Sequence, residues 1–122
     1  QKNTAGKPAT WSVGTGEKTG LKDATYELVT FGSSFNVTDR QVTLKEVKRI
    51  SRPQGWFACM WNHRDLDDPL QKTCEDIIKQ HIAGYSYGSR REDQTEPIRV
   101  SGLFHEPQYL EGKTVAEFSL DD

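Results

Sequence analysis

The sequence predicts an α+β domain in which a mostly antiparallel β-sheet, or a β-sandwich-like pair of sheets, of about six or seven strands carries one amphipathic helix. Short segments rich in aromatic and β-branched residues recur along the chain, and one segment instead has apolar residues at helical spacing. The chain has 122 residues, which suits one domain. We therefore expect a mobile tail at residues 1–8 and a single globular domain at residues 9–122.

The predicted helix spans residues 69–83. Asp68 suits an N-cap, and Pro69 suits the first helical position, where its missing N–H costs nothing. Gly84 can adopt the left-handed conformation that ends a helix. One face of this helix is apolar, with His81 at its margin as a structural residue: Leu70, Cys74, Ile77, Ile78, His81 and Ile82.

The segment Trp56–Trp61 is apolar on both alternating faces, which predicts a central strand covered on both sides. The segment before it, residues 41–50, is ambiguous. Val42 and Leu44 alternate as in a strand, yet residues 43–46 match a helical capping box. Because residues 52–55 read Arg-Pro-Gln-Gly, which suits a type I turn, we interpret residues 41–50 and 55–61 as an antiparallel pair.

Several other segments are expected to complete the sheet. Glycines punctuate residues 14–20, but the closing Gly-Lys-Ser/Thr of a phosphate-binding loop is absent and no helix is expected to follow. An exposed loop or hairpin connection is the better interpretation. The remaining predicted strands are residues 9–13, residues 25–31 with a resumption at 35–38 after a break at Gly32–Ser34, a short segment at 85–87, and residues 97–104 and 114–120.

The two cysteines and one sequon indicate secretion. If the predicted strand packs under the helix, Cys59 and Cys74 come within bonding range, and a bridge would close a loop of roughly 15 residues worth about 3 kcal/mol. The alternative is two buried free thiols. Asn36 begins the glycan-acceptor triplet Asn-Val-Thr, and a chain that opens on Gln1 suits a processed mature protein or a trimmed one.

Composition restricts the classes of partner. Hydrophobic residues make up 34% of the chain and charged residues 28%, and the net charge is −2. Neither nucleic acid nor an anionic membrane is expected as a partner on these grounds, and no apolar run approaches the roughly 20 residues of a membrane span. We expect a monomer without a cofactor.

Two side-chain groups suggest alternative chemistry. The segment containing His63, Asp65, Asp67 and Asp68 is rich in oxygen ligands for a hard cation, but it lacks the spacing of a calcium-binding loop, and Asp68 already serves as an N-cap. A capped, solvated loop without metal is the preferred interpretation. The other group has the ingredients of metal-free RNA cleavage, an acid, a base and cations: His63, His105, Glu106 and Arg49, with Lys45, Lys48 and Arg52 nearby in sequence.

Exposed loops offer a third possibility, a contact surface for a protein or a glycan. The predicted loops 62–67, 88–96 and 104–112 mix aromatic, basic and amide side chains, a composition typical of interfaces. The candidate binding residues in these loops are Arg90, Arg91, Glu92, Gln108 and Tyr109.

The general organisation of the chain resembles small secreted effector or avirulence proteins of plant-pathogenic fungi, particularly the rusts. The shared features are a short chain, cysteines in the contexts FACMW and QKTCED, a polar glycine-bearing start and a β-rich body without an enzyme signature. The resemblance implies a non-enzymatic protein that is delivered into a host plant, binds a host protein and is open to recognition by an immune receptor. A ribonuclease-like hydrolase and a carbohydrate-binding module are the alternatives.

Overall fold

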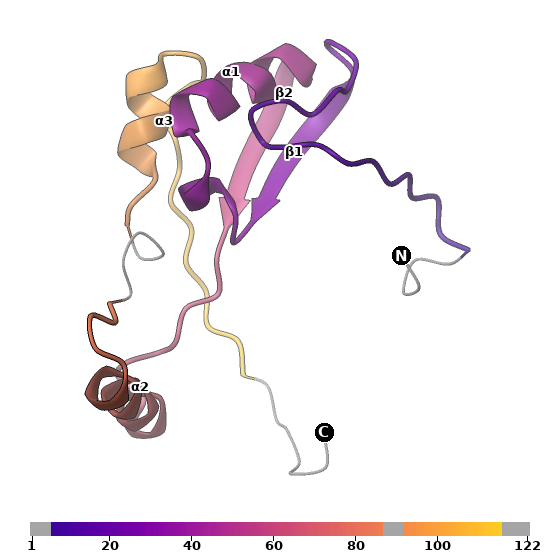
Figure 1. The fold of residues 1–122 in the computed structure, drawn as a ribbon. Coiled ribbons are helices and arrows are strands. Elements are labelled where there is room, and N and C mark those ends of the chain that lie inside the picture. The colour runs from indigo at the N-terminus through magenta and orange to yellow at the C-terminus, as the bar shows by residue number, and fades with distance from the viewer. Residues whose placement is uncertain (1–5, 87–91, 116–122) are drawn as a thin grey trace.

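The computed structural model describes residues 6–86 and 92–115 and shows an α/β arrangement (Figure 1). The elements in chain order are β1 (Tyr26–Gly32), the 3-10 helix η2 (Phe35–Val37), α1 (Arg40–Ile50), β2 (Ser51–Met60), α2 (Pro69–His81) and α3 (Thr95–Ser101). Within these described ranges the sheet has two strands, and they are parallel. The prediction of a mostly antiparallel sheet or β-sandwich with six or seven strands is therefore wrong.

β1 and β2 form a β-α-β unit, because α1 connects two parallel strands. The register pairs Leu28 with Trp56 and Gly32 with Met60. Between Tyr26 and Leu28 the register is irregular, because residues 52–55 of β2 lie opposite a single residue of β1. Gln54 has a φ of 65° there, so the turn predicted at residues 52–55 is a local bulge within β2 rather than a link between antiparallel strands.

Residues 40–50 are helical, and the strand predicted for residues 41–50 is wrong. Asp39 is the N-cap, and its carboxylate accepts a hydrogen bond from the backbone N–H of Val42 at 3.1 Å. The buried residues of α1 follow a helical spacing of one, three and three residues: Thr43, Leu44, Val47 and Ile50. Tertiary burial of this face decides the conformation that the local sequence left open.

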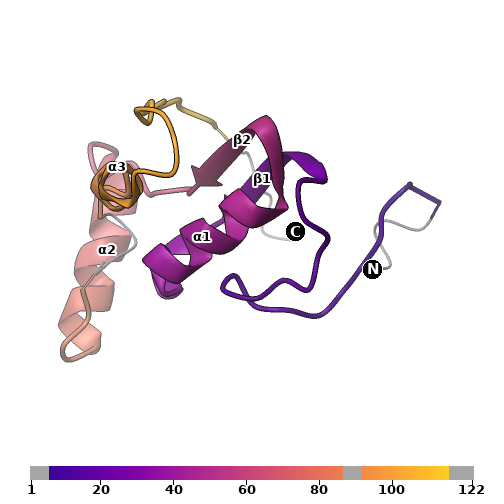
Figure 2. The ribbon, with the colours of Figure 1, turned by 90° about the horizontal axis from the view of Figure 1, so that it is seen from above.

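The core lies between α1 and one face of the strand pair. Phe35, Leu44 and Ile98 form a buried cluster within it, and Phe31 and Phe57 pack against this cluster. The rings of Phe31, Phe35 and Phe57 meet edge to face, with centroids 5.4 to 5.9 Å apart. Viewed from above, α1 runs along the strands with α3 beside its end (Figure 2).

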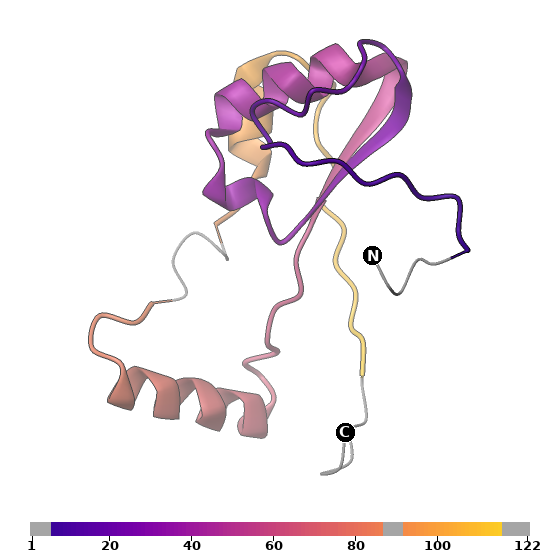
Figure 3. The ribbon, with the colours of Figure 1, turned by 45° about the vertical axis from the view of Figure 1, so that its right-hand side comes forward.

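α2 begins where the sequence predicts and ends two residues earlier than predicted. The Asp68 carboxylate accepts from the Gln71 backbone N–H at 2.8 Å, Pro69 occupies the first turn, and the last helical residue is His81. The helix nevertheless lies apart from the strands, as two views agree (Figures 1 and 3). Leu70 on its apolar face is 72% exposed. The predicted packing of this helix on the sheet is therefore wrong.

That separation also removes the predicted disulfide. Cys59 lies half-buried on β2, Cys74 lies exposed on α2, and both are free thiols. The bridge depended on a strand packed beneath the helix, and that packing is not formed. Burial raises the pKa of the Cys59 thiol to about 11.

Among the remaining predicted strands, the structure confirms one. The strand predicted at residues 25–31 is confirmed as β1, whereas residues 9–13 have no regular structure and residues 35–37 form η2. Within the segment predicted as a strand at residues 97–104, residues 97–101 belong to α3. Residues 85–86 and 114–115 are not strands. The other residues of those two predicted strands, 87 and 116–120, lie outside the described residues. The same is true of most of the predicted tail, residues 1–5.

None of the helices within the described ranges has both the length and the apolar character needed to cross a lipid bilayer.

Candidate functional site

The carboxyl ends of β1 and β2 meet at one edge of the sheet. Gly32 is paired with Met60, and the backbone N–H of Ser33 donates to the Met60 carbonyl at 2.8 Å. In open α/β sheets with parallel strands, ligands bind outside the carboxyl ends of the strands. The residues that follow these two ends, 33–36 and 61–63, are therefore the candidate site.

A hydrogen bond between the side chains of Trp61 and Asn36 joins the two strand ends. The indole N–H of Trp61 donates to Oδ1 of Asn36 at 2.9 Å, and Asn36 is only 8% exposed. The Trp61 ring is half-buried and packs against the core cluster. Because Asn36 follows β1 and Trp61 follows β2, this contact fixes the position of the Trp61 ring relative to the end of β1.

The turn after β1 places two serine hydroxyl groups at the same edge. Ser33 has a φ of 51°, a conformation that few non-glycine residues adopt. Neither the Ser33 hydroxyl nor the Ser34 hydroxyl makes a hydrogen bond within the described part of the chain. Apart from its chain neighbours, a Cβ at Gly32 would meet no atom of residues 6–86 and 92–115 within 4 Å.

The N-terminal end of α1 beside this edge is closed by two carboxylates. The Asp39 side chain caps the helix, and Oε1 of Glu17 accepts from the Asp39 backbone N–H at 2.9 Å. Gly16 lies so close that a Cβ there would approach Cγ2 of Thr38 to 3.0 Å and the Phe31 ring to 3.2 Å. The glycine-bearing loop therefore packs on the core and occupies the helix end, so this end offers no vacancy for a phosphate.

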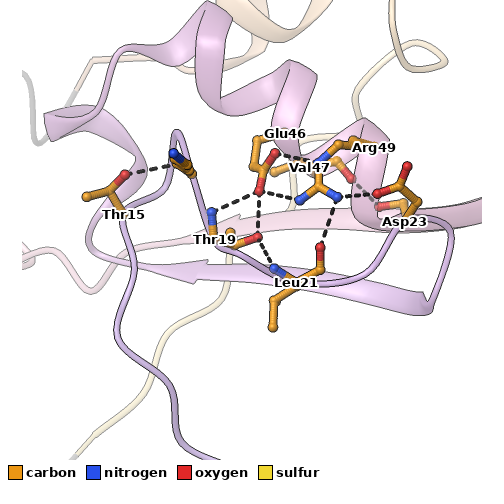
Figure 4. A network of polar contacts seen from close by, with 9 residues as sticks. Thr15, Thr19, Leu21, Asp23, Glu46, Val47 and Arg49 are labelled. Atoms are coloured by element: carbon orange, nitrogen blue, oxygen red, sulfur yellow. Dashed lines mark hydrogen bonds and ion pairs between the residues drawn. The ribbon is translucent and has the colours of Figure 1, made fainter.

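The loop continues along α1 and is held by a polar network (Figure 4). Oε1 of Glu46 accepts from the Thr19 backbone N–H at 2.8 Å and from the Thr19 hydroxyl at 2.6 Å. The Arg49 guanidinium binds Glu46 at 2.7 and 2.8 Å, donates to the Leu21 carbonyl at 2.9 Å and pairs with Asp23. These hydrogen bonds, that of Arg49 foremost, lower the pKa of Glu46 from 4.5 to about 2.

Most predicted site residues lie elsewhere and do not converge. For the RNA-cleavage alternative, Arg49 is held by Glu46 and Asp23 far along α1, whereas Glu106 pairs with Arg99 of α3 at 2.5 Å. His63 and His105 are both exposed, in segments that follow β2 and α3 respectively. An acid, a base and a cation are therefore not assembled from this set.

The oxygen-rich segment after β2 is used in local structure. Asp65 pairs with Lys113 at 3.0 Å, which lowers the pKa of its carboxyl group, and it also accepts from the Asp67 backbone N–H. Asp68 caps α2. Residues 6–86 and 92–115 contain no cluster of three or more His, Cys, Asp or Glu side chains arranged as metal ligands.

The predicted surface residues are spread over separate segments. Glu92 pairs with Arg40 of α1 at 2.6 Å, while Gln108 and Tyr109 are exposed in the C-terminal segment. Arg90 and Arg91 lie outside the described residues. The predicted glycan acceptor Asn36 is buried and accepts from Trp61, so the folded chain does not present it for glycosylation.

The candidate edge itself was missed by the sequence interpretation. From the sequence alone, Gly32, Ser33 and Ser34 indicate only a break after the predicted strand 25–31, and Trp61 is only the last residue of the predicted central strand. The usable signal was a strand ending in small residues, followed by a helix and a second apolar strand, because that order predicts a parallel pair with adjacent carboxyl ends.

Comparisons with known proteins point to a family. Residues 1–59, just under half of the chain, match the sequence model of the methyltransferase domain family. An uncharacterized methyltransferase of Schizosaccharomyces pombe is 31% identical over 64 residues, which are 52% of this chain and 26% of that protein. The ubiquinone/menaquinone biosynthesis C-methyltransferase UbiE of Caulobacter vibrioides is 37% identical over 65 residues, which are 52% of this chain and 25% of that protein.

The chain thus spans about a quarter of the length of the curated relatives it matches. No solved structure matches it. The matched residues include β1, α1 and nearly all of β2, and two parallel strands joined by a helix are consistent with part of a Rossmann-like methyltransferase fold.

These matches overturn the functional expectations drawn from the sequence. The resemblance to secreted fungal effectors is wrong, and so is the preference for a non-enzymatic binding protein, because the matched family is one of enzymes. The alternatives of a ribonuclease-like hydrolase and a carbohydrate-binding module are wrong as well, because the matched family is one of methyltransferases, which are neither hydrolases nor carbohydrate-binding modules. Over its first half, this chain is similar to part of a methyltransferase domain.

Proposed function

We propose that the β1-α1-β2 unit is part of an S-adenosylmethionine-dependent methyltransferase domain, and that its carboxyl edge contributes to binding the methyl donor. The observation that carries this proposal is that the match to the methyltransferase family, over residues 1–59, contains β1, α1 and all but the last residue of β2. The parallel unit thus lies within the segment of sequence similarity, and open parallel sheets bind ligands outside the carboxyl ends of their strands.

The residues at the edge suit an adenosyl group. Adenine offers a flat π-surface for an aromatic ring such as Trp61, and ribose offers hydroxyl groups for the unpartnered hydroxyls of Ser33 and Ser34. The edge segments 32–36 and 61–63 contain no carboxylate, the group that often binds ribose hydroxyls in such folds. We therefore assign them part of the donor site only.

S-adenosylmethionine supplies an electrophilic methyl group on a positively charged sulfur. In this proposal Asn36 orients Trp61, and Trp61 together with the serine turn holds the adenosyl end of the donor. The name of the Caulobacter relative assigns C-methylation in quinone biosynthesis to that protein. We assign no acceptor to this chain. Secretion and a host protein partner stay predictions from the sequence.

Titration of the 122-residue chain with S-adenosylhomocysteine, followed by amide chemical shifts, tests donor binding. We expect saturable shifts at residues 32–36 and at Trp61 and Asn62. Replacing both edge serines, Ser33→Ala and Ser34→Ala, should weaken binding at least threefold, whereas Ser86→Ala at an exposed site after α2 serves as the matched control. Shifts that are absent, or confined to α2 and α3, would refute the assignment.

A further inference from the structure

We propose that residues 92–104, named here the α3 segment, position the ring of Trp61, and that an ion pair between Arg40 and Glu92 sets how tightly this segment is docked. The inference rests on the proposed function, because it assigns regulation of donor binding at the edge that carries Trp61. It gives a role to a part of the chain that lies beyond the family match, which ends at residue 59.

The α3 segment completes the core behind the candidate edge. Ile98 of α3 is 7% exposed and forms a buried cluster with Phe35 and Leu44. Trp61 packs against this cluster. The residue after Phe35 is Asn36, which accepts the hydrogen bond from the Trp61 indole. The position of the Trp61 ring therefore depends on two supports, that hydrogen bond and a cluster to which α3 contributes.

The end of the α3 segment lies against β2 and the last turn of α1. The ring centroids of Phe104 and Phe57 are 5.6 Å apart, and Nζ of Lys48 lies 5.8 Å from the centroid of the Phe104 ring. These are contacts between aromatic rings and between a cation and a ring. They do not involve the Arg40–Glu92 ion pair at the other end of the segment.

Polar contacts hold the beginning of the α3 segment against the first turn of α1. Nη2 of Arg40 lies 2.6 Å from Oε2 of Glu92, and Nε2 of Gln41 donates to the Pro97 carbonyl at 3.0 Å. The side chain of Arg40 is 25% exposed and that of Glu92 is 50% exposed. Because both charges are partly exposed to water, salt screens their attraction, so the strength of this contact varies with ionic strength.

Hydrogen bonding between α1 and the α3 segment is incomplete. Nε of Arg40 and Oε1 of Gln94 are buried and have no hydrogen-bond partner in residues 6–86 and 92–115. The Gln94 side chain uses its amide N–H group, which donates to the Glu92 carbonyl at 2.8 Å. In the docked state the two unpartnered groups have lost water without a replacement, so docking carries a cost that the Arg40–Glu92 pair helps to offset. The balance between the docked and undocked segment is therefore sensitive to that pair.

Undocking of the α3 segment removes Ile98 from the cluster on which Trp61 packs. The Trp61 ring then gains freedom, and binding of an adenosyl group has to restrict that freedom again. Docking and donor binding are therefore coupled: a change that weakens the ion pair weakens donor binding, and a bound donor favours the docked segment. Added salt acts in the same direction as loss of the pair.

Charge reversal and charge exchange test the coupling. Glu92→Arg places two cations together and should weaken binding of S-adenosylhomocysteine to the 122-residue chain about fivefold, as calorimetric titration can measure. The exchange variant, Arg40→Glu with Glu92→Arg, restores a pair of opposite charges and should recover the affinity to within about twofold of the unmodified chain. Glu111→Arg, at an exposed residue outside the segment, makes the same change in net charge and is the matched control, which should leave the affinity unchanged.

The NMR signal of the Trp61 indole N–H tests the positioning without any donor. Glu92→Arg should shift or broaden this signal and speed up amide hydrogen exchange in residues 95–104, and the exchange variant should restore both. A purely structural role for the ion pair would lower the free energy of unfolding but leave the Trp61 signal of the folded chain in place.

Three results would overturn the proposal: an unchanged Trp61 signal in Glu92→Arg, a loss of affinity that the exchange variant does not recover, or an equal loss in Glu111→Arg. A shifted Trp61 signal with unchanged donor affinity would also reject the coupling. If the unmodified chain binds no S-adenosylhomocysteine, the proposed function fails, and the Trp61 signal alone decides whether the α3 segment positions this ring.

Discussion

The β1-α1-β2 unit and the α2 region are both well-formed locally, but they are stabilised in different ways. In the first, Phe35 and Leu44 are fully buried, and the polar network around Glu46 ties a distant loop to α1. In the second, Glu75 is the one buried residue of α2, and it is held by Arg64 at 2.6 Å and by the Tyr85 hydroxyl at 3.4 Å.

This difference shows that strong capping signals in the sequence of a helix do not mean that the helix belongs to the hydrophobic core. α2 has the clearest capping residues in the sequence, yet Leu70 and Ile77 on its apolar face are more than half exposed. The segment with the ambiguous local signal, α1, supplies the buried face of the core. Similarity to the methyltransferase family likewise covers the first region and ends before the second.

The largest expected effect comes from truncating the core. Leu44→Ala should lower the free energy of unfolding by about 2 to 5 kcal/mol, because Leu44 is completely buried and its loss leaves a cavity. Ile77→Ala on α2, at a side chain 51% exposed, should cost less than about 1 kcal/mol. Urea unfolding followed by tryptophan fluorescence measures both. Equal losses would mean that α2 belongs to the same cooperative core.

A smaller effect is expected from the polar network. Glu46→Gln should destabilise the chain by about 2 kcal/mol at pH 7, because a charge-assisted set of hydrogen bonds to Arg49 and Thr19 is weakened. Asp76→Asn, which removes an exposed ion pair with Lys72 in α2, should cost no more than about 0.5 kcal/mol.

The pH dependence of the Glu46 effect follows from its pKa. The pKa is lowered on folding, from 4.5 to about 2, so the stabilisation is fully present above about pH 4.5 and is lost as the pH falls towards 2. The difference in unfolding free energy between Glu46→Gln and the unmodified chain should therefore shrink across that window. A difference that stays constant from pH 5 to pH 2.5 would show that Glu46 is not held as the structure indicates.

The smallest effect, on reactivity rather than stability, concerns the two cysteines. Cys74 is exposed on α2, whereas Cys59 is half-buried and its pKa is raised to about 11, which keeps the reactive thiolate scarce near neutral pH. Under native conditions at pH 7.5, iodoacetamide should modify Cys74 at least ten times faster than Cys59, as peptide mass spectrometry can measure. Two unreactive cysteines that react only after reduction would establish the disulfide instead.

Much of the local structure could be predicted from the sequence. Two adjacent residues, Asp68 and Pro69, indicate the start of α2, and the aromatic and β-branched residues of β1 are a strong strand signal. These elements depend on side chains and backbone groups within a few residues of one another. Their positions relative to the core were not predictable in the same way, because no local signal specifies what an apolar face will contact.

The errors arose where local patterns were compatible with two structures. Val42 and Leu44 alternate as in a strand, but the buried set also includes Thr43, which reveals the helical face only once the contacts are known. Similarly, Ile98 and Val100 alternate as in a strand, but both lie in α3. Pro97 in the first turn and Gly102, with a φ of 63°, are helix start and stop signals. The candidate edge depends on parallel pairing between distant strands, and a proline-glycine turn favoured the antiparallel alternative.

The register of β1 and β2 also has a consequence for the order of folding. Leu28 pairs with Trp56, which lies 28 positions further along the chain, so this contact forms only after a long loop has closed. α2 is stabilised by capping and by neighbours close in sequence, and local helices form within about a microsecond. During refolding, helical signal from α2 should therefore precede the quenching or shift of Trp56 fluorescence, which reports the slower, topology-limited pairing of the strands.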